Sequence, residues 1–353
     1  MFANGLVSSG PRFFIAGRIC LSYATYVQAR KLAEILRRLE KTRVVVAGDP
    51  CLDANVYGRA EAVAKEAPVV ALEAAEEVFA PGQATNVAAN AAALGANVYF
   101  VGVAGDDERR VRLAELLKGF GVDAGGLVAE AGRPTTFKIK YVTRESQRHN
   151  QHLFHVYRQE KRPAGRRTIR RMQALAAEAL TNARALVLSD YGNGTLSAGF
   201  AKWLIEESAR RRLVSVANAR GDLKKFRGAT AAVANMEELA DLAGAKALAK
   251  GDVAAAMGTA AAKLNVRYLV ITAGDEGMYA WPVRGRGRHF APAARDVVDV
   301  TGAGDTVTAA LAAALGAGLG LSGAAEFANL AAAAVVGREG TSVARAAELR
   351  RFL

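Results

Sequence analysis

Cysteine is scarce in this 353-residue sequence: Cys20 and Cys51 are the two that occur, and no CxxC pair is present. This scarcity argues against a disulfide framework or a zinc site, and it favours a reducing compartment, so we expect a cytoplasmic protein. Long uncharged apolar runs are also lacking, apart from an alanine- and glycine-rich stretch near 306–325. We interpret that stretch as one buried core helix and expect no membrane insertion.

Acidic residues are missing from the first 33 positions, although Arg12, Arg18, Arg30 and Lys31 occur there. We interpret residues 1–30 as an N-terminal extension without regular structure, followed by one domain over residues 31–353. A targeting segment is the alternative, but no clean apolar core with a small-residue cleavage site follows.

The basic excess gives a formal net charge of +13. Lysine and arginine are spread along the chain, and no zinc-finger, helix-turn-helix or RNA-binding signature accompanies them. We therefore expect no nucleic-acid partner. An anionic small substrate together with a nucleotide explains the charge equally well.

Short β-branched runs alternate with helical periodicity along most of the chain. Near-continuous apolar strands separated by helices predict a mostly parallel sheet covered on both faces, which is an α/β fold. Each predicted strand ends in or near Gly, Asp or Asn, and ligands of such sheets bind beyond the carboxyl ends of the strands. The predicted strands are 43–49, 97–107, 185–192, 213–218 and 268–277.

Two segments, 54–80 and 134–158, alternate apolar with polar or basic residues and predict a small β-lid over the edge of the sheet. His149, His152 and His155 are closely spaced there. On a regular strand His152 and His155 would point to opposite faces, and no carboxylate or cysteine joins them, so we expect no structural metal.

The stretch TGAGD places Gly302, Ala303 and Gly304 between Thr301 and Asp305, just ahead of a predicted helix. Glycine lets a ligand approach the backbone, and a helix N-terminus carries unpaired N–H groups and partial positive charge. The loop therefore predicts an anion hole, with Asp305 placed to take a proton from a substrate hydroxyl during phosphoryl transfer. An ordinary aspartate N-cap after a glycine turn is the alternative.

Four stretches resemble motifs of the ribokinase-like (PfkB) carbohydrate kinase family and occur in that family's order. DVTGAGDT resembles its second signature, with Val300 in place of the usual threonine. The others are PGQATNVAANAAALGANVYFVGVAGDD (81–107), similar to the first signature, NMEE (235–238), similar to its N-x-x-E, and TAGDEG (272–277), similar to its T-x-G-x-x-G.

This resemblance implies a ribokinase-like three-layer α/β/α fold and a sugar kinase that uses ATP, Mg²⁺ and a monovalent cation such as K⁺. It implies that Asp305 is the catalytic base and that the 302–304 amides hold the transferring phosphate. The other implied site residues are Asp53, Gly82, Gln83 and Asn86 for the sugar, Asn235, Glu238, Thr272, Gly274 and Gly277 for the nucleotide side, and Glu238, Asp299 and Thr301 for metal ions.

Within the family, GDPCLDANVYG, LVLSDYGNG and FRGAT look most like the bacterial D-glycero-β-D-manno-heptose 7-phosphate kinases of lipopolysaccharide core synthesis. That similarity implies phosphorylation of the 1-hydroxyl to the 1,7-bisphosphate, and it implies a homodimer through the lid. Many such proteins carry a cytidylyltransferase-like domain after the kinase, and we expect this chain to be the kinase half. Lys138, Lys140, Arg144 and Arg148 are available for the 7-phosphate; a solvated basic strand face is the alternative.

The chain departs from those relatives at Gln83, Asn193, Asn218, His155 and Tyr157, where they have Gly, Lys, Asp, Arg and Asp. Each change alters charge or shape where substrate specificity arises. A kinase for another sugar or sugar phosphate and a non-catalytic nucleotide-binding scaffold therefore stay open as alternatives. The presence of Asp305 favours a kinase over the scaffold.

Overall fold

The computed structural model describes residues 23–144, 151–294, 299–338, 340 and 342–352. Cys20, Arg148 and His149, on which the sequence analysis drew, lie outside the described residues.

A nine-stranded sheet forms the centre of the molecule, in the order β13-β12-β11-β10-β9-β8-β1-β4-β5. The strands from β11 to β5 are parallel, and β12 and β13 run antiparallel at one edge. The predicted mostly parallel sheet is therefore confirmed. The strands are β1 (Arg43–Gly48), β4 (Asn97–Gly105), β5 (Val122–Glu130), β8 (Ala185–Asp190), β9 (Val214–Ala219), β10 (Ala231–Asn235), β11 (Tyr268–Thr272), β12 (Met278–Pro282) and β13 (Arg288–Phe290).

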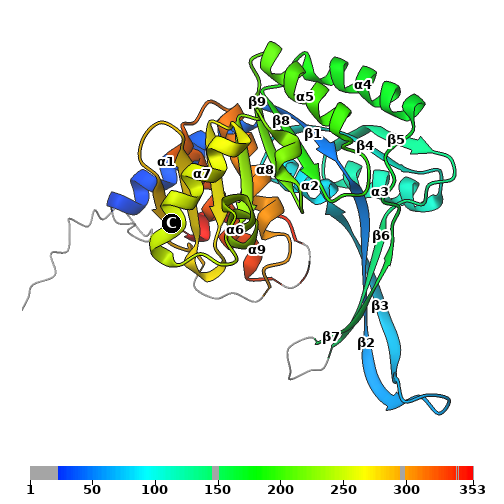
Figure 1. Cartoon of the computed structure of the whole chain (residues 1–353). Helices are drawn as coiled ribbons and strands as arrows, with labels where there is room; N and C mark the ends of the chain where they lie inside the picture. Colours follow the sequence, from blue (N-terminus) through cyan, green and yellow to red (C-terminus); the bar gives the residue numbers. More distant parts are fainter. Residues whose placement is uncertain (1–22, 145–150, 295–298, 339, 341, 353) are drawn as a thin grey trace, which may run out of the picture.

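Helices cover both faces of the sheet. Successive side chains of a strand point to opposite sides, so a strand made of apolar residues has two apolar faces to bury. In β1, Val44 and Val46 pack into one apolar cluster while Val45 and Ala47 pack into the other. The first face carries α1 (Tyr23–Leu39), α2 (Ala84–Ala93), α3 (Glu108–Gly119), α8 (Ala303–Gly316) and α9 (Leu321–Val336), and the second carries α4 (Arg166–Leu180), α5 (Ala198–Arg210), α6 (Met236–Ala243) and α7 (Val253–Leu264). The result is the expected three-layer fold (Figure 1). Short 3₁₀ helices occur at Leu223–Phe226, Lys250–Asp252, Gly274–Glu276 and Leu349–Phe352.

The prediction of a single core helix near 306–325 is wrong. The chain forms two helices there, α8 and α9, which pack on each other. Gly318 has a φ of 82°, a left-handed conformation that ends the first helix and that glycine adopts without steric cost. The predicted domain boundary at residue 30 falls inside α1. In the part of the chain described, none of the helices combines the length and apolarity that crossing a bilayer requires.

A second sheet of four strands forms the predicted lid, in the order β3-β2-β6-β7. Its strands are β2 (Pro50–Val63), β3 (Val70–Gln83), β6 (Phe137–Thr143) and β7 (Gln151–Arg158). Figure 1 shows it as an arm that extends away from the layered body. The base of β2 is buried whereas its outer end, from Arg59 onward, is exposed, so the lid joins the body where β2 and β3 meet the sheet.

The lid places His152 and His155 on the same face, which corrects the prediction that they point apart. A register shift between Tyr141 and Val142 on β6 marks an irregularity opposite them. A bulge of this kind adds one residue to one strand and reverses the alternation beyond it. His152 Nδ1 therefore lies 3.0 Å from His155 Nε2. Among the described residues no group of three or more metal-binding side chains forms here or elsewhere.

Asp49, which directly follows β1, anchors the loop after β8. Its fully buried carboxylate accepts hydrogen bonds from the backbone amides of Tyr191 (2.8 Å), Asn193 (3.0 Å) and Thr195 (2.9 Å). Charge-assisted bonds to backbone amides are stronger than neutral ones. This carboxylate therefore fixes the loop from residue 191 to residue 195 against the carboxyl edge of the sheet.

Asp49→Asn should lower the free energy of unfolding by about 2–4 kcal/mol, because an amide NH₂ would face donors and leave buried N–H groups unpaired. Urea denaturation followed by circular dichroism measures this change. The control is Asp123→Asn, an exposed aspartate that accepts a local hydrogen bond from the Gly125 amide at 2.9 Å, and it should change stability by less than about 0.5 kcal/mol. Equal effects of the two substitutions would contradict the anchoring role.

Candidate active site

A cavity of about 510 Å³ opens at the carboxyl ends of β8 to β11 and at the N-terminus of α8. The location agrees with the general position of ligand sites in parallel α/β sheets. Of the residues predicted from the sequence, the cavity is lined by Asn235, Glu238, Thr272, Gly274, Gly277 and the 301–305 loop. Two cationic side chains, Lys138 and Arg220, also line it. Asp53, Gly82, Gln83, Asn86 and Asp299 lie outside its lining.

The N-terminus of α8 presents its backbone to the cavity. Gly302 has a φ of 81° and turns the chain into the helix, and the Ala303 amide donates to the Val300 carbonyl at 3.1 Å. A Cβ placed on Gly304 would meet no atom within 4 Å, so the space in front of that residue is open. The first amides of a helix lack intrahelical acceptors, which makes this open space a suitable place for a phosphate.

Asp305 lies in the first turn of α8 and is 7% exposed. Tyr191 donates its hydroxyl to Oδ1 at 2.5 Å, and Asn86 donates its amide to Oδ2 at 2.9 Å. Burial raises the pKa of Asp305 from 3.8 to about 6, against the lowering effect of these two hydrogen bonds and of the positive charge on Arg220. A carboxylate with a pKa near neutrality is suited to act as a general base.

Tyr191 is a site residue that the motifs do not name. It follows the carboxyl end of β8, the position where a parallel sheet presents functional groups, and that position was the available signal. Burial and the negative charge of Asp305 raise the pKa of Tyr191 well above its ordinary value, so its hydroxyl stays a donor to Asp305. The guanidinium of Arg220 lies over the Tyr191 ring, 5.3 Å from its centroid.

Helix α2 supports Asp305 from the other side. Asn90 donates to the carbonyl of Asn86 at 3.0 Å and to its side-chain oxygen at 3.1 Å. The Asn90 side-chain oxygen in turn accepts from Thr306 at 3.0 Å and from the amide of Ala344 at 3.0 Å. All eight residues from Ala84 to Ala91 are buried. This network fixes the amide of Asn86, so the direction of its hydrogen bond to Asp305 is set before any ligand binds.

Asp53 lies on β2 at the base of the lid and is 5% exposed. The Cys51 thiol donates to its Oδ1 at 3.3 Å. A Cβ on Gly82 would lie 2.2 Å from the same oxygen, so glycine is required there for the carboxylate to occupy its position. Burial lowers the pKa of Lys140 on β6, and the negative charge of Asp53 counteracts that effect. The charges of Asp53 and Lys140 therefore influence each other at the base of the lid.

Gln83, which precedes α2, has φ 52° and ψ −132°. Glycine normally supplies this conformation, and a residue with a side chain pays on the order of 1–3 kcal/mol for it. The Gln83 side-chain oxygen accepts a hydrogen bond of 2.9 Å from the amide of Asn193 in the loop after β8. Two of the positions at which the chain departs from its relatives therefore contact each other.

Asn235 and Glu238 form a capping box at the start of α6. The Asn235 side chain accepts from the Glu238 amide at 2.8 Å, and the Glu238 carboxylate accepts from the Asn235 amide at 2.9 Å. Burial raises the pKa of Glu238, against the lowering effects of that bond and of Arg220. Glu238 and Asp305 are the two carboxylates in the described lining of the cavity. The Glu238 carboxylate fits Mg²⁺, which binds proteins through one or two carboxylates and keeps substrate phosphates and water as its other ligands.

The 272–277 loop, which the sequence predicts on the nucleotide side, forms one wall of the cavity. Thr272 donates its hydroxyl to the Ala234 carbonyl at 3.3 Å, which ties β11 to β10. Gly274 has a φ of 58°, and a Cβ there would meet no atom within 4 Å. Gly277 differs, because a Cβ there would lie 2.2 Å from the Phe290 carbonyl oxygen. Gly277 therefore has a packing reason to be glycine, whereas Gly274 leaves space at the cavity.

Asp299 connects the loop before α8 to the turn after α9. Its carboxylate accepts from the Thr301 amide at 2.8 Å and from the Gly340 amide at 2.9 Å. Burial alone would raise its pKa, but these bonds and the charge of Lys140 leave it lowered, so the group stays ionised. An ionised carboxylate can hold a monovalent cation, although both of its oxygens already accept backbone bonds.

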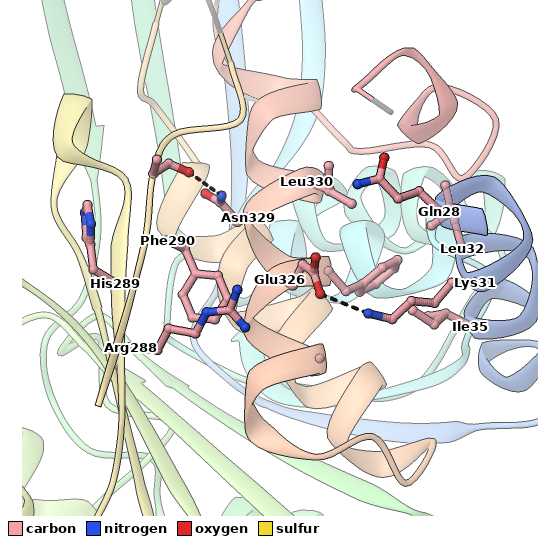
Figure 2. Close-up of a pocket in the computed structure, with 13 residues that line it drawn as sticks. Gln28, Lys31, Leu32, Ile35, Arg288, His289, Phe290, Glu326, Asn329 and Leu330 are labelled. Atoms are coloured by element: carbon pink, nitrogen blue, oxygen red, sulfur yellow. Dashed lines mark hydrogen bonds and ion pairs between the residues drawn. The ribbon is translucent and has the colours of Figure 1, made fainter. Parts of the chain in front are cut away.

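A second cavity, of about 310 Å³, lies between α1, β13 and α9 (Figure 2). Lys31 on α1 forms an ion pair with Glu326 on α9 across it, with the ammonium nitrogen 3.1 Å from the carboxylate oxygen. Asn329 lines both cavities, and its amide donates to the Ala291 carbonyl at 2.7 Å. Asn329 and the chain at Ala291 therefore form part of the wall between the two cavities.

Comparison with known proteins assigns the family. Residues 41–347 match the model of the pfkB family carbohydrate kinases. The chain is 41% identical over 318 residues to the bifunctional protein HldE of Halorhodospira halophila, covering 88% of this chain and 63% of that protein. It is 36% identical over 321 residues to HldE of Azorhizobium caulinodans, covering 90% of this chain and 66% of that protein. The chain thus spans less than two thirds of the length of these relatives.

Solved structures agree on the fold. Arabidopsis thaliana ribokinase with ribose and ATP is 22% identical, with a TM-score of 0.68 over 88% of this chain and 98% of that one. Escherichia coli phosphofructokinase-2 with substrates and products is 17% identical, with a TM-score of 0.73 over 88% and 97%. Together with the family match, these findings establish that the chain belongs to the pfkB family of carbohydrate kinases, phosphotransferases with an alcohol group as acceptor.

Proposed function

We propose that the protein transfers the γ-phosphoryl group of ATP to the 1-hydroxyl of D-glycero-β-D-manno-heptose 7-phosphate. The observation that carries the transfer chemistry is the carboxylate of Asp305, buried between Tyr191 and Asn86 at the N-terminus of α8. The similarity to two HldE proteins over about 90% of the chain supports the heptose phosphate as acceptor.

Asp305 takes the proton from the acceptor hydroxyl as that oxygen attacks the γ-phosphorus. The hydrogen bonds from Tyr191 and Asn86 occupy one carboxylate oxygen each and hold the plane of the carboxyl group. The open backbone at Gly304 and the guanidinium of Arg220 stabilise the charge on the phosphoryl oxygens. Mg²⁺, when bound beside Glu238, neutralises phosphate charge.

The acceptor lies between the lid and α8, with Asp53 accepting hydrogen bonds from its hydroxyls. Among the lid cations predicted to meet the 7-phosphate, Lys138 lines the cavity. Arg144 is engaged elsewhere, because its guanidinium lies 2.8 Å from a carboxylate oxygen of Glu76 and 4.0 Å from the centroid of the Tyr57 ring. Lys140 is buried and does not line the cavity, and Arg148 lies outside the described residues. Lys138 is therefore the lid cation that we assign to the distal phosphate.

Asp305→Asn should reduce kcat by a factor of about 10²–10⁴ while ATP still binds, because the base is lost and the fold is kept. Coupled ADP release measures this with ATP, Mg²⁺ and a panel of the heptose 7-phosphate, fructose, fructose phosphates and ribose. Turnover of a different sugar would assign a different acceptor. Binding of ATP without turnover of any sugar would favour a scaffold.

The same substitution serves as its own folding control. The raised pKa of Asp305 means that ionisation costs stability, and this cost is complete above about pH 6 and disappears as the pH falls toward 3.8. The rise from 3.8 to about 6 corresponds to about 3 kcal/mol. Asp305→Asn removes this cost, but its NH₂ group would face the donor of Tyr191 or Asn86, so the two effects oppose each other. The melting temperature at pH 7 should therefore stay within about 5 °C of the wild type, and a larger fall would attribute the lost activity to misfolding.

The pH profile should identify the base independently. Below about pH 6 the carboxyl group of Asp305 is protonated, so kcat/KM should fall tenfold per pH unit on the acid side. Tyr191→Phe removes a bond to the ionised form that is worth about 1.5–3 kcal/mol, so the acid limb should move up by about one to two pH units. If the acid limb of the kcat/KM profile does not move in Tyr191→Phe, the pKa that controls activity belongs to a group other than Asp305.

Lys138→Gln should raise KM for the heptose 7-phosphate about tenfold or more and leave KM for ATP within about twofold, because a charged hydrogen bond to phosphate is lost. Initial rates at varied acceptor concentration measure this. Arg144→Gln is the control, because Arg144 directly follows the strand β6 that carries Lys138 and is paired with Glu76. This substitution should leave both KM values within about twofold of the wild type. A larger effect at Arg144 than at Lys138 would reverse the assignment.

A further inference from the structure

The hydrogen bond between Gln83 and Asn193 joins the two segments that position the catalytic carboxylate. Asn86, three residues after Gln83, and Tyr191, two residues before Asn193, both donate to Asp305. The residue before Gln83 is Gly82, which lies against the carboxylate of Asp53. The pair therefore joins the parts of the chain that present Asp53 and Asp305, although neither Gln83 nor Asn193 lines the 510 Å³ cavity itself.

The amide of Asn193 has unused hydrogen-bonding capacity. Asn193 is 4% exposed, and its side-chain oxygen has no partner among the described residues. Reversing both amides would let Gln83 donate to that oxygen, but the Asn193 NH₂ group would then lack an acceptor. In either arrangement one buried polar atom of Asn193 is left for a ligand or a water molecule, and burying such an atom without a partner is unfavourable.

The backbone conformation of Gln83 is a second, independent indication that this pair has a role beyond the fold. Its φ of 52° with ψ −132° suits glycine, so the turn itself gives no reason for a side chain. Asn265 also has a positive φ, but it is a left-handed helix cap with ψ 44°, a conformation that asparagine tolerates. Gln83 therefore carries a conformational cost that its position in the fold does not require.

We propose that Gln83 and Asn193 form a neutral amide clamp that binds a hydroxyl group of the sugar acceptor and so determines acceptor specificity. The clamp offers both a donor and an acceptor and carries no charge, which matches a hydroxyl and disfavours a phosphate or carboxylate at this position. The inference rests on the proposed kinase function, and it names residues for acceptor recognition that are distinct from the lid cation Lys138.

The test uses the full-length protein and four variants. Gln83→Gly removes the amide and the strain, Gln83→Ala removes the amide and keeps the strain, and Asn193→Ala removes the partner. Arg212→Gly is the matched control, because Arg212 also has a positive φ, 58°, and lies at the end of α5. Melting temperatures and KM values for acceptor and for ATP are measured for each, with the acceptor that the wild type turns over in the panel.

We expect Gln83→Gly to melt about 2 °C or more above the wild type and to raise KM for the acceptor tenfold or more, with KM for ATP within twofold. Gln83→Ala and Asn193→Ala should raise the acceptor KM similarly without the gain in melting temperature. Arg212→Gly should leave both KM values unchanged.

Two results would overturn the clamp. A lower melting temperature for Gln83→Gly would show that the pair serves the fold, and an acceptor KM within twofold of the wild type in the Gln83 variants would show that the pair does not meet the sugar. Absence of wild-type turnover with every sugar would contradict the proposed kinase function instead. The melting comparison requires no turnover, so it still tests the clamp in that case.

Discussion

The buried carboxylate of Asp305 is the constraint on which the site depends. Removing an ionisable group from water is unfavourable unless partners hold it, and here one partner comes from α2 and the other from the loop after β8. Those partners are fixed in turn, the first by Asn90 and the second by Asp49. Parts of the chain that are far apart in sequence are thus required to meet at one carboxyl group.

Much of the fold follows from the sequence because its signals are local. Runs such as RVVVAG and YLVIT are rich in β-branched residues, and their strands were predicted. Strand β10, with the sequence AAVAN, was not, because alanine has a low preference for strands and tertiary packing decides its conformation. The alanine-rich region after residue 303 was predicted as one helix, but it forms two. The break between them depends on the backbone angle at Gly318, which a hydrophobic pattern does not reveal.

The residues of the candidate site also fall into two groups, those that a local sequence motif predicts and those that only contacts between distant segments reveal. Motifs were sufficient to name part of the lining of one cavity, namely the 301–305 loop, Asn235, Glu238, Thr272, Gly274 and Gly277. Contacts between distant segments could not be named: Tyr191 with Asp305, Gln83 with Asn193, and His152 with His155 across a strand irregularity. A one-dimensional pattern records which residues follow a strand, but it does not record which of them face each other once the strands are adjacent.

The alanine content of α2, α8 and α9 affects which amino-acid substitutions the protein can accept during evolution. Alanine loses no side-chain conformational entropy on folding, and its small volume lets helix backbones approach closely. Nearly every buried position of α8 between Asp305 and Leu315 is occupied by a small residue. A larger side chain there would displace the helix that carries Asp305, so this layer tolerates few substitutions. The outer part of the lid, exposed from Arg59 onward on β2, faces no such restriction, so substitutions can accumulate there while the packing around Asp305 stays the same.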